Sequence, residues 1–163
     1  MDAFRTNWTF IKVETDEGLY GWGEASLGTR EKALEGCVED LKRHVVGRNP
    51  IDIEKMWFEV YRDSYWKGGP VFLSALSGIE IAMWDIVGKF YNTPVCNLLG
   101  GRVRDRVPMY ANAWFTGART PDDFAGKAKE TVALGVKALK WDPFGKAHMT
   151  LSLEEMESAV SCV

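Results

Sequence analysis

The chain has 163 residues, of which 46% are hydrophobic and 26% charged. This composition is typical of a globular protein, and the length suffices for one ordinary domain. The formal charge of −3 argues against the basic surface that a nucleic-acid partner requires. The three cysteines form no C-x-x-C pair, no signal peptide is evident, and no apolar run approaches the ~20 residues of a membrane span. We therefore expect a cytoplasmic protein with neither a nucleic-acid nor a membrane partner.

The first predicted element is a β-hairpin. Residues 9–15 alternate between two faces, residues 19–25 follow them, and Asp16-Glu17-Gly18 in between is typical of a tight turn. Gly21 and Gly23 leave space for another element to approach the second strand closely. A two-stranded hairpin is marginal alone, so we expect a third strand, for which the sequence gives no clear candidate.

Three helices are expected after the hairpin. Apolar residues recur at helical spacing over 29–46. Asn49 and Pro50 are the residue types of an N-cap and a first turn, and they predict a second helix that ends near Lys67. The third and most apolar helix is expected over 70–90, and its strip of small residues indicates close packing against another element.

The pattern changes after residue 106. Strands are expected at 107–113 and 136–141, with a helix capped by Thr120 between them and another capped helix opened by Ser152. Strand, helix, strand, helix is the order of a parallel β/α structure, whose sheet is covered by helices on both faces. Two strands cannot make such a sheet, so we expect the pattern to continue beyond this chain.

Three segments carry the signature of a known family: Val13–Ala25, Ala75–Lys89 and Thr93–Arg102. In residues, order and spacing they resemble the enolase superfamily, in its branch related to mandelate racemase and muconate lactonizing enzyme. The resemblance implies an α+β capping domain over 1–106, built of an antiparallel meander and helices. It implies that 107–163 holds the first two β/α units of an incomplete (β/α)8-type barrel.

Within that branch, the segments 65–70 and 139–145 resemble galactonate- and gluconate-type acid-sugar dehydratases. The resemblance implies a homo-oligomeric enzyme that uses Mg²⁺, removes the proton α to a sugar-acid carboxylate and then expels the β-hydroxyl as water. The Asp and two Glu that bind Mg²⁺ in the family would lie beyond Val163. We therefore expect no metal ligand in this chain, and no activity from the chain alone.

Lys140 and Asp142 are the candidate catalytic residues. Lys140 ends the second expected barrel strand, where barrel active sites are built. The family carries a K-x-K motif here; Lys140 matches its first lysine and Asp142 stands in place of the second. This departure disfavours a two-base racemase. It leaves Lys140 to position the substrate carboxylate, and Asp142 to orient Lys140 or bond a hydroxyl. Periodicity alone would make Lys140 a strand-end lysine that reaches solvent.

Four residues are candidates for substrate binding. Tyr65, Trp66 and Lys67 correspond to a loop that closes over the barrel mouth in the family. Trp66 would wall the site and Lys67 would meet a carboxylate; the alternative is a helix end with ordinary aromatic packing. Asn112, at the end of the first expected barrel strand, is a weaker polar candidate.

Other residues are expected outside the chemistry. His44 and His148 suit helix-surface and loop positions, and residues 1–8 would follow a second closing loop. The glutamates at 154, 155 and 157 are expected to be solvated partners of a helix dipole rather than metal ligands. Two other functions stay open: a racemase or cycloisomerase of the same superfamily, and a noncatalytic fragment that binds partner subunits.

Overall fold

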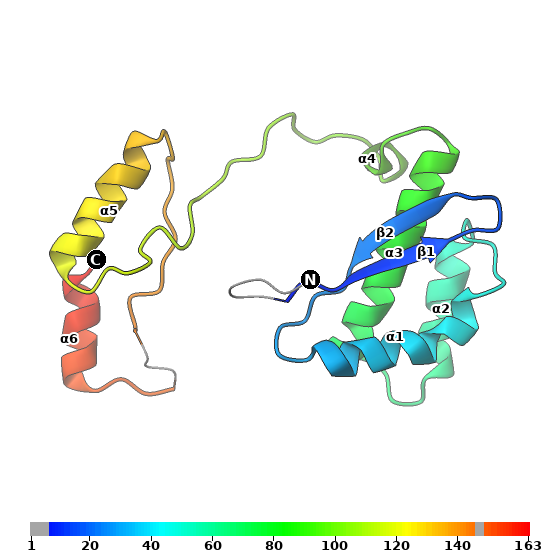
Figure 1. Cartoon of the computed structure of the whole chain (residues 1–163), viewed down its shortest axis with the longest axis horizontal. Coiled ribbons are helices and arrows are strands. Elements are labelled where there is room, and N and C mark those ends of the chain that lie inside the picture. The colour runs from blue at the N-terminus through cyan, green and yellow to red at the C-terminus, as the bar shows by residue number, and fades with distance from the viewer. Residues whose placement is uncertain (1–6, 146–148) are drawn as a thin grey trace. The chain divides into compact units, whose positions relative to one another are not determined.

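The computed structural model describes residues 7–145 and 149–163, and the chain divides after Val103 into two compact units. The first unit contains β1 (Phe10–Glu14), β2 (Tyr20–Glu24), α1 (Glu31–Val45), α2 (Ile53–Asp63), α3 (Pro70–Phe90) and α4 (Val95–Leu98). The second contains α5 (Pro121–Ala133) and α6 (Leu153–Ser161) (Figure 1). The first unit is thus a small α+β fold.

The predicted hairpin is confirmed. β1 and β2 pair in antiparallel register from Phe10 opposite Glu24 to Glu14 opposite Tyr20. Gly18 has a φ of +85°, the left-handed conformation that the tight turn requires. Within the described residues the sheet has two strands, so the expected third strand is not among them.

The hairpin lies directly on α3 (Figure 1). A Cβ atom added at Gly21 would lie 1.9 Å from the carbonyl oxygen of Ala82, and one added at Gly23 would lie 1.9 Å from that of Gly78. Only glycine allows two backbones to approach this closely. The close approach predicted from Gly21 and Gly23 is therefore confirmed, and the strip of small residues on α3 is its other half.

α3 is the central helix of the first unit. Its inner side is buried, and α1 and α2 pack on it with apolar side chains: Leu34 and Leu41 from α1, Met56 and Val60 from α2. By length and composition, α3 is also a candidate membrane span, so the expectation that no segment qualifies was wrong. Half of its apolar window is buried inside the unit, as in the core helix of a soluble protein, and the candidate is weak evidence for a membrane.

Two predicted helix boundaries need correction. Asn49 is not the N-cap of α2; its Oδ1 accepts a hydrogen bond from the backbone N–H of Ile51 at 3.1 Å, and Asp52 takes the N-cap position. Asparagine readily closes such turns onto the backbone two residues on, which competes with capping. The helix also ends before Lys67, so residues 64–69 form a loop.

In the second unit the helices agree with the prediction and the strands do not. α5 begins with Thr120 as the expected N-cap, which Asp123 completes to a capping box, and α6 begins with the expected capping box of Ser152. The strands expected at 107–113 and 136–141 reduce to a single parallel bridge between Ala111 and Leu139. Parallel strands depend on neighbouring strands and on helices over both faces. A lone pair lacks this support, so the described residues do not form the expected barrel units.

Candidate functional site

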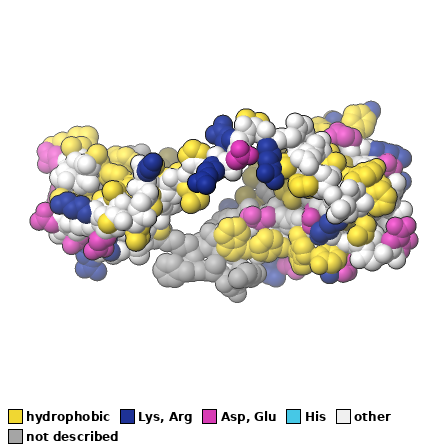
Figure 2. Space-filling view, turned by 90° about the horizontal axis from the view of Figure 1, so that it is seen from above, with side chains coloured by type: hydrophobic (Ala, Val, Ile, Leu, Met, Phe, Trp, Pro, Cys, Tyr) yellow, Lys and Arg dark blue, Asp and Glu magenta, His cyan; other side chains and the backbone are white. Residues whose placement is uncertain are grey.

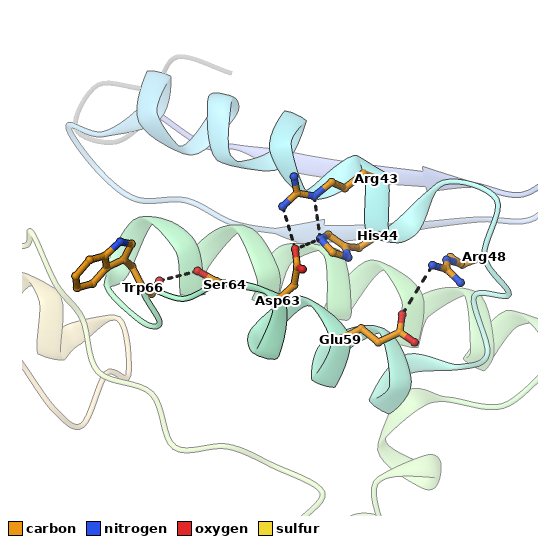
Figure 3. A network of polar contacts seen from close by, with 7 residues as sticks. All are labelled: Arg43, His44, Arg48, Glu59, Asp63, Ser64 and Trp66. Atoms are coloured by element: carbon orange, nitrogen blue, oxygen red, sulfur yellow. Dashed lines mark hydrogen bonds and ion pairs between the residues drawn. The ribbon is translucent and has the colours of Figure 1, made fainter.

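The loop that carries Tyr65, Trp66 and Lys67 follows a polar network at the end of α2 (Figure 3). Asp63, the last residue of α2, accepts from Arg43 Nη2 at 3.0 Å and lies 3.2 Å from His44 Nε2. These contacts tie the end of α2 to the last turn of α1. Ser64 Oγ then donates to the carbonyl oxygen of Trp66 at 2.7 Å. The base of the loop is therefore held by hydrogen bonds and ion pairs.

The side chains of this loop extend into solvent. Tyr65 is 86% exposed and Trp66 is 85% exposed, and their rings meet edge to face with centroids 5.2 Å apart. Figure 3 shows the Trp66 indole directed away from the network. Lys67 Nζ lies 5.5 Å from the centre of the Tyr61 ring. Because neither Tyr65 nor Trp66 packs into the core of the first unit, both rings are available to a ligand or to another surface.

The backbone of Lys140 is held on both sides. Its N–H donates to the carbonyl oxygen of Ala111 at 2.9 Å, and its own carbonyl accepts from the indole Nε1 of Trp114 at 3.0 Å. Its side chain is exposed, and it forms no ion pair with any residue of 7–145 or 149–163. A fixed backbone with a free ammonium group suits a residue that meets an anionic ligand.

Asn112 and Asp142 both bond to nearby backbone. Asn112 Oδ1 accepts from the N–H of Ala113 at 2.9 Å, and Asp142 Oδ1 accepts from the N–H of Phe144 at 3.0 Å. Both side chains are exposed. The bridge between Ala111 and Leu139 places Asn112 and Lys140 one residue beyond the paired positions. The second unit therefore brings Lys140 and Asn112 together, whereas Tyr65, Trp66 and Lys67 belong to the first unit.

Aromatic side chains form a cluster behind Lys140, which the sequence analysis did not identify. The Trp114 ring meets the Trp141 ring edge to face at 5.2 Å and the Phe124 ring at 6.3 Å. Phe115 stacks on Phe124. Trp141 Nε1 is buried and has no hydrogen-bond partner among the described residues. No short-range pattern predicts that Trp114 reaches residues 26 or 27 positions further on.

The described residues hold no cluster of three or more His, Cys, Asp or Glu side chains that could bind a metal ion. Glu155 instead accepts from the backbone N–H of Ser152 at 2.8 Å and completes the capping box of α6. The expectation that it serves the helix terminus is therefore confirmed. His44 does not have the open helix-surface position expected for it: its side chain is 15% exposed and faces Asp63 of α2. His148 and residues 1–6 lie outside the described residues.

A cavity of about 780 Å³ lies elsewhere in the first unit, between the hairpin and the end of α1. Its lining is largely apolar, with Val13, Val45 and Met83 among the contributors and Lys42 and Arg48 at its polar side. None of the candidate residues Tyr65, Trp66 and Lys67 lines it. The cavity is therefore separate from the residues that the sequence selects.

Comparison with known proteins gives a consistent set of relatives. Residues 4–100 match the family described as mandelate racemase / muconate lactonizing enzyme, N-terminal domain. A D-galactonate dehydratase of Klebsiella pneumoniae (strain 342) is 37% identical over 156 residues, which cover 96% of this chain and 40% of that protein. The D-galactonate dehydratase of Xanthomonas campestris pv. campestris (strain B100) is 39% identical over 153 residues, 94% of this chain and 39% of that protein. The chain thus spans about 40% of the length of these curated relatives.

Solved structures agree with these relatives. A mandelate racemase/muconate lactonizing enzyme from Sulfitobacter sp. has a TM-score of 0.81 at 33% identity, over 95% of this chain and 43% of that one. An enolase from Pantoea ananatis with bound D-gluconate and Mg has a TM-score of 0.72 at 33% identity, over 81% of this chain and 32% of that one.

Proposed function

We propose that this chain, which belongs to the mandelate racemase / muconate lactonizing enzyme family, is the N-terminal part of an acid-sugar dehydratase. The observation that carries the proposal is the similarity to D-galactonate dehydratases, which continues past the N-terminal domain through the segment of Lys140 and Asp142. The bound D-gluconate and Mg of the Pantoea protein support a sugar acid as the class of substrate.

The proposed reaction removes water from an aldonic acid such as galactonate or gluconate. A base takes the proton from the carbon α to the carboxylate, and the electron pair of that C–H bond forms a carbon–carbon double bond. The β-hydroxyl leaves as water with one added proton. The resulting enol tautomerises to a 2-keto-3-deoxy acid, so substrate equals product plus one water.

The residues of this chain take binding and positioning roles in the proposal. Lys140 offers the substrate carboxylate an ammonium group that has no ion-pair partner in the described part of the chain. This charge-assisted contact would fix the α-carbon. Asp142 accepts from a substrate hydroxyl; the alternative, that it orients Lys140, lacks support because the described residues show no ion pair between the two. Trp66 supplies an exposed apolar wall and Lys67 a second cation, while Asn112 offers its amide group.

Mg²⁺, when bound, would neutralise the carboxylate and stabilise the enolate that forms beside it. The described residues do not fit this ion, because they bring no three acidic or histidine side chains together. Hard cations need several convergent oxygen ligands. We therefore assign the Mg²⁺ ligands to a part of the enzyme outside residues 7–145 and 149–163.

The genomic reading frame tests this assignment. We expect the frame to continue past Val163 and to encode an Asp, a Glu and a Glu at the ends of successive predicted strands. An authentic stop codon after Val163 would contradict the proposal and favour a noncatalytic protein that binds partner subunits. A panel of aldonic acids with the encoded protein would then identify the substrate. A product that retains its β-hydroxyl and differs only in α-carbon configuration would instead indicate a racemase.

A further inference from the structure

We infer that Trp114 is a positioning residue for Lys140: its indole fixes the backbone from which the Lys140 side chain extends toward substrate. The inference rests on the proposed function, because it assumes that Lys140 meets the substrate. It adds Trp114, which lies in the loop that follows the bridged residue Ala111, to the residues that determine the site.

Hydrogen bonds hold the backbone of Lys140 on both sides. The peptide before Lys140 is held through its N–H, 2.9 Å from the Ala111 oxygen, and the peptide after it through its carbonyl, 3.0 Å from Trp114 Nε1. With both flanking peptides fixed, the direction of the Cα–Cβ bond is fixed as well. The bond to Ala111 joins two backbone groups, whereas the bond to Trp114 uses a side chain. A substitution at Trp114 can therefore remove the second bond.

The loop before Trp114 is built to return the indole to this position. Ala113 has a φ of +59°, a left-handed conformation that is energetically unfavourable for most residues other than glycine. Three bonds hold it there: Asn112 Oδ1 accepts from its N–H, and Thr116 donates to its carbonyl through both Oγ1, at 2.7 Å, and N–H, at 3.1 Å. Backbone strain that is held in this way is often found at functional sites.

Ring packing limits the orientation of the Trp114 indole. Trp114 meets Trp141 at an interplanar angle of 80° and Phe124 of α5 at 81°. Phe115 also meets the Trp114 ring edge to face, at 5.7 Å. Edge-to-face contacts with these three rings favour one orientation of the indole, and so one direction of its Nε1–H. The Trp114 indole thus contacts Phe124 of α5 with its ring, and it also contacts Lys140, through the carbonyl, and Trp141, through its ring.

The test is a double-mutant cycle in the full-length enzyme, with kcat and KM measured on its aldonic acid. Trp114→Phe keeps an aromatic ring and removes the N–H donor. We expect it to lower kcat/KM about 5- to 10-fold, the effect of one hydrogen bond. In a Lys140→Met background the same substitution should have no further effect, because the group that it positions is gone. Trp84→Phe is the matched control; it removes the indole bond to Glu80, at 3.4 Å, and should leave kcat/KM unchanged.

Each outcome decides between the two claims. Two outcomes overturn the positioning role and leave the proposed function standing. In the first, the effects of Trp114→Phe and Lys140→Met on kcat/KM are fully additive. In the second, Lys140→Met strongly lowers kcat/KM and Trp114→Phe does not change it. No effect of Lys140→Met overturns the role proposed for Lys140 itself. If Trp114→Phe does not fold, Thr116→Val loosens the loop without touching a ring, and the same coupling to Lys140 is expected.

A second measurement is independent of activity. In the full-length enzyme, the indole N–H of Trp114 should exchange with solvent more slowly than the same N–H does in the Thr116→Val variant, whose loop is loosened. Equal exchange rates would show that the bond to the Lys140 carbonyl does not persist in solution, and would overturn the inference.

Discussion

Asp85 of α3 joins the helix to the hairpin through charge. Its Oδ2 accepts from the backbone N–H of Trp22 at 2.9 Å and from Lys89 Nζ at 2.8 Å, and Lys89 also donates to the Tyr20 carbonyl at 2.7 Å. Partial burial raises the pKa of Asp85, but the Lys89 ammonium and the Trp22 N–H together outweigh it and hold that pKa below its ordinary value. The ionised carboxylate therefore stabilises the folded state.

The direction of this pKa shift predicts how stability depends on pH. A carboxylate with a lowered pKa stabilises the fold at pH values above its unfolded pKa, ~3.9 for Asp. This stabilisation is lost as the pH falls through the folded pKa. Asp85→Asn should lower the free energy of unfolding by about 1 kcal/mol near neutral pH, a value discounted for its part-exposed side chain. In urea unfolding, the difference from the unsubstituted chain should shrink below about pH 4.

Asp16→Asn in the hairpin turn is the control, because Asp16 is also an aspartate but its side chain is exposed. It should leave the unfolding curve near that of the unsubstituted chain at every pH. A difference for Asp85→Asn that stays constant from pH 7 to pH 3 would contradict the assigned role of the charge.

At the scale of elements, the contact between β2 and α3 determines the fold of the first unit. Gly23→Ala should destabilise the chain by at least about 3 kcal/mol, the upper end of overpacking costs, because the obstructing atom is the backbone oxygen of Gly78. Gly36→Ala is the matched control. It lies exposed in α1 with no atom in the way, and alanine there should stabilise the helix by about 0.5–1 kcal/mol. Thermal unfolding that gives equal shifts for both substitutions would contradict the close approach.

These elements also show what a sequence can predict. The close approach to β2 was predicted correctly from Gly21 and Gly23 because the effect of a glycine is local. A missing Cβ on one face of a strand permits close contact with any element that packs there. The N-cap at Thr120 and the capping box at Ser152 were predicted correctly for the same reason. The strands at 107–113 and 136–141 were not formed as expected, because a parallel strand depends on neighbours that a local pattern does not contain.

The candidate site shows the same division. Lys140 and Asp142 were selected by a motif two residues apart, and the structure adds that the Lys140 backbone is held from both sides. Trp114 was missed because its bond spans 26 positions and depends on the left-handed turn at Ala113. Alanine carries no sequence signal for such a turn, since glycine and asparagine are the residues that usually adopt it.

At the scale of the whole chain, the two units differ in how much they bury. The first contains nearly all of the buried core, whereas Ala159 is the one buried residue among those described after Val103. Figure 2 shows hydrophobic side chains exposed among charged side chains of both signs. Apolar residues of the second unit, such as Leu134 and Val160, are 84% and 71% exposed. Such surfaces require partners for stability.

We therefore predict that the isolated 163-residue chain self-associates. We also predict that limited proteolysis cleaves the second unit, residues 104–163, before it cleaves the first. Light scattering during size-exclusion chromatography should report species larger than a monomer. Proteolysis should leave a resistant fragment of the first unit, because segments with few buried contacts open most readily. A monodisperse monomer that resists protease along its whole length would contradict this prediction.

We propose that this chain is the N-terminal part of an acid-sugar dehydratase. The most direct test of this proposal is the formation of a 2-keto-3-deoxy acid from galactonate or gluconate, with and without Mg²⁺. The assay compares the protein encoded by the complete reading frame with the 163-residue chain. We predict Mg²⁺-dependent product from the complete protein and none from the chain alone. No product from the complete protein with any aldonic acid, or product from the 163-residue chain by itself, would contradict the claim.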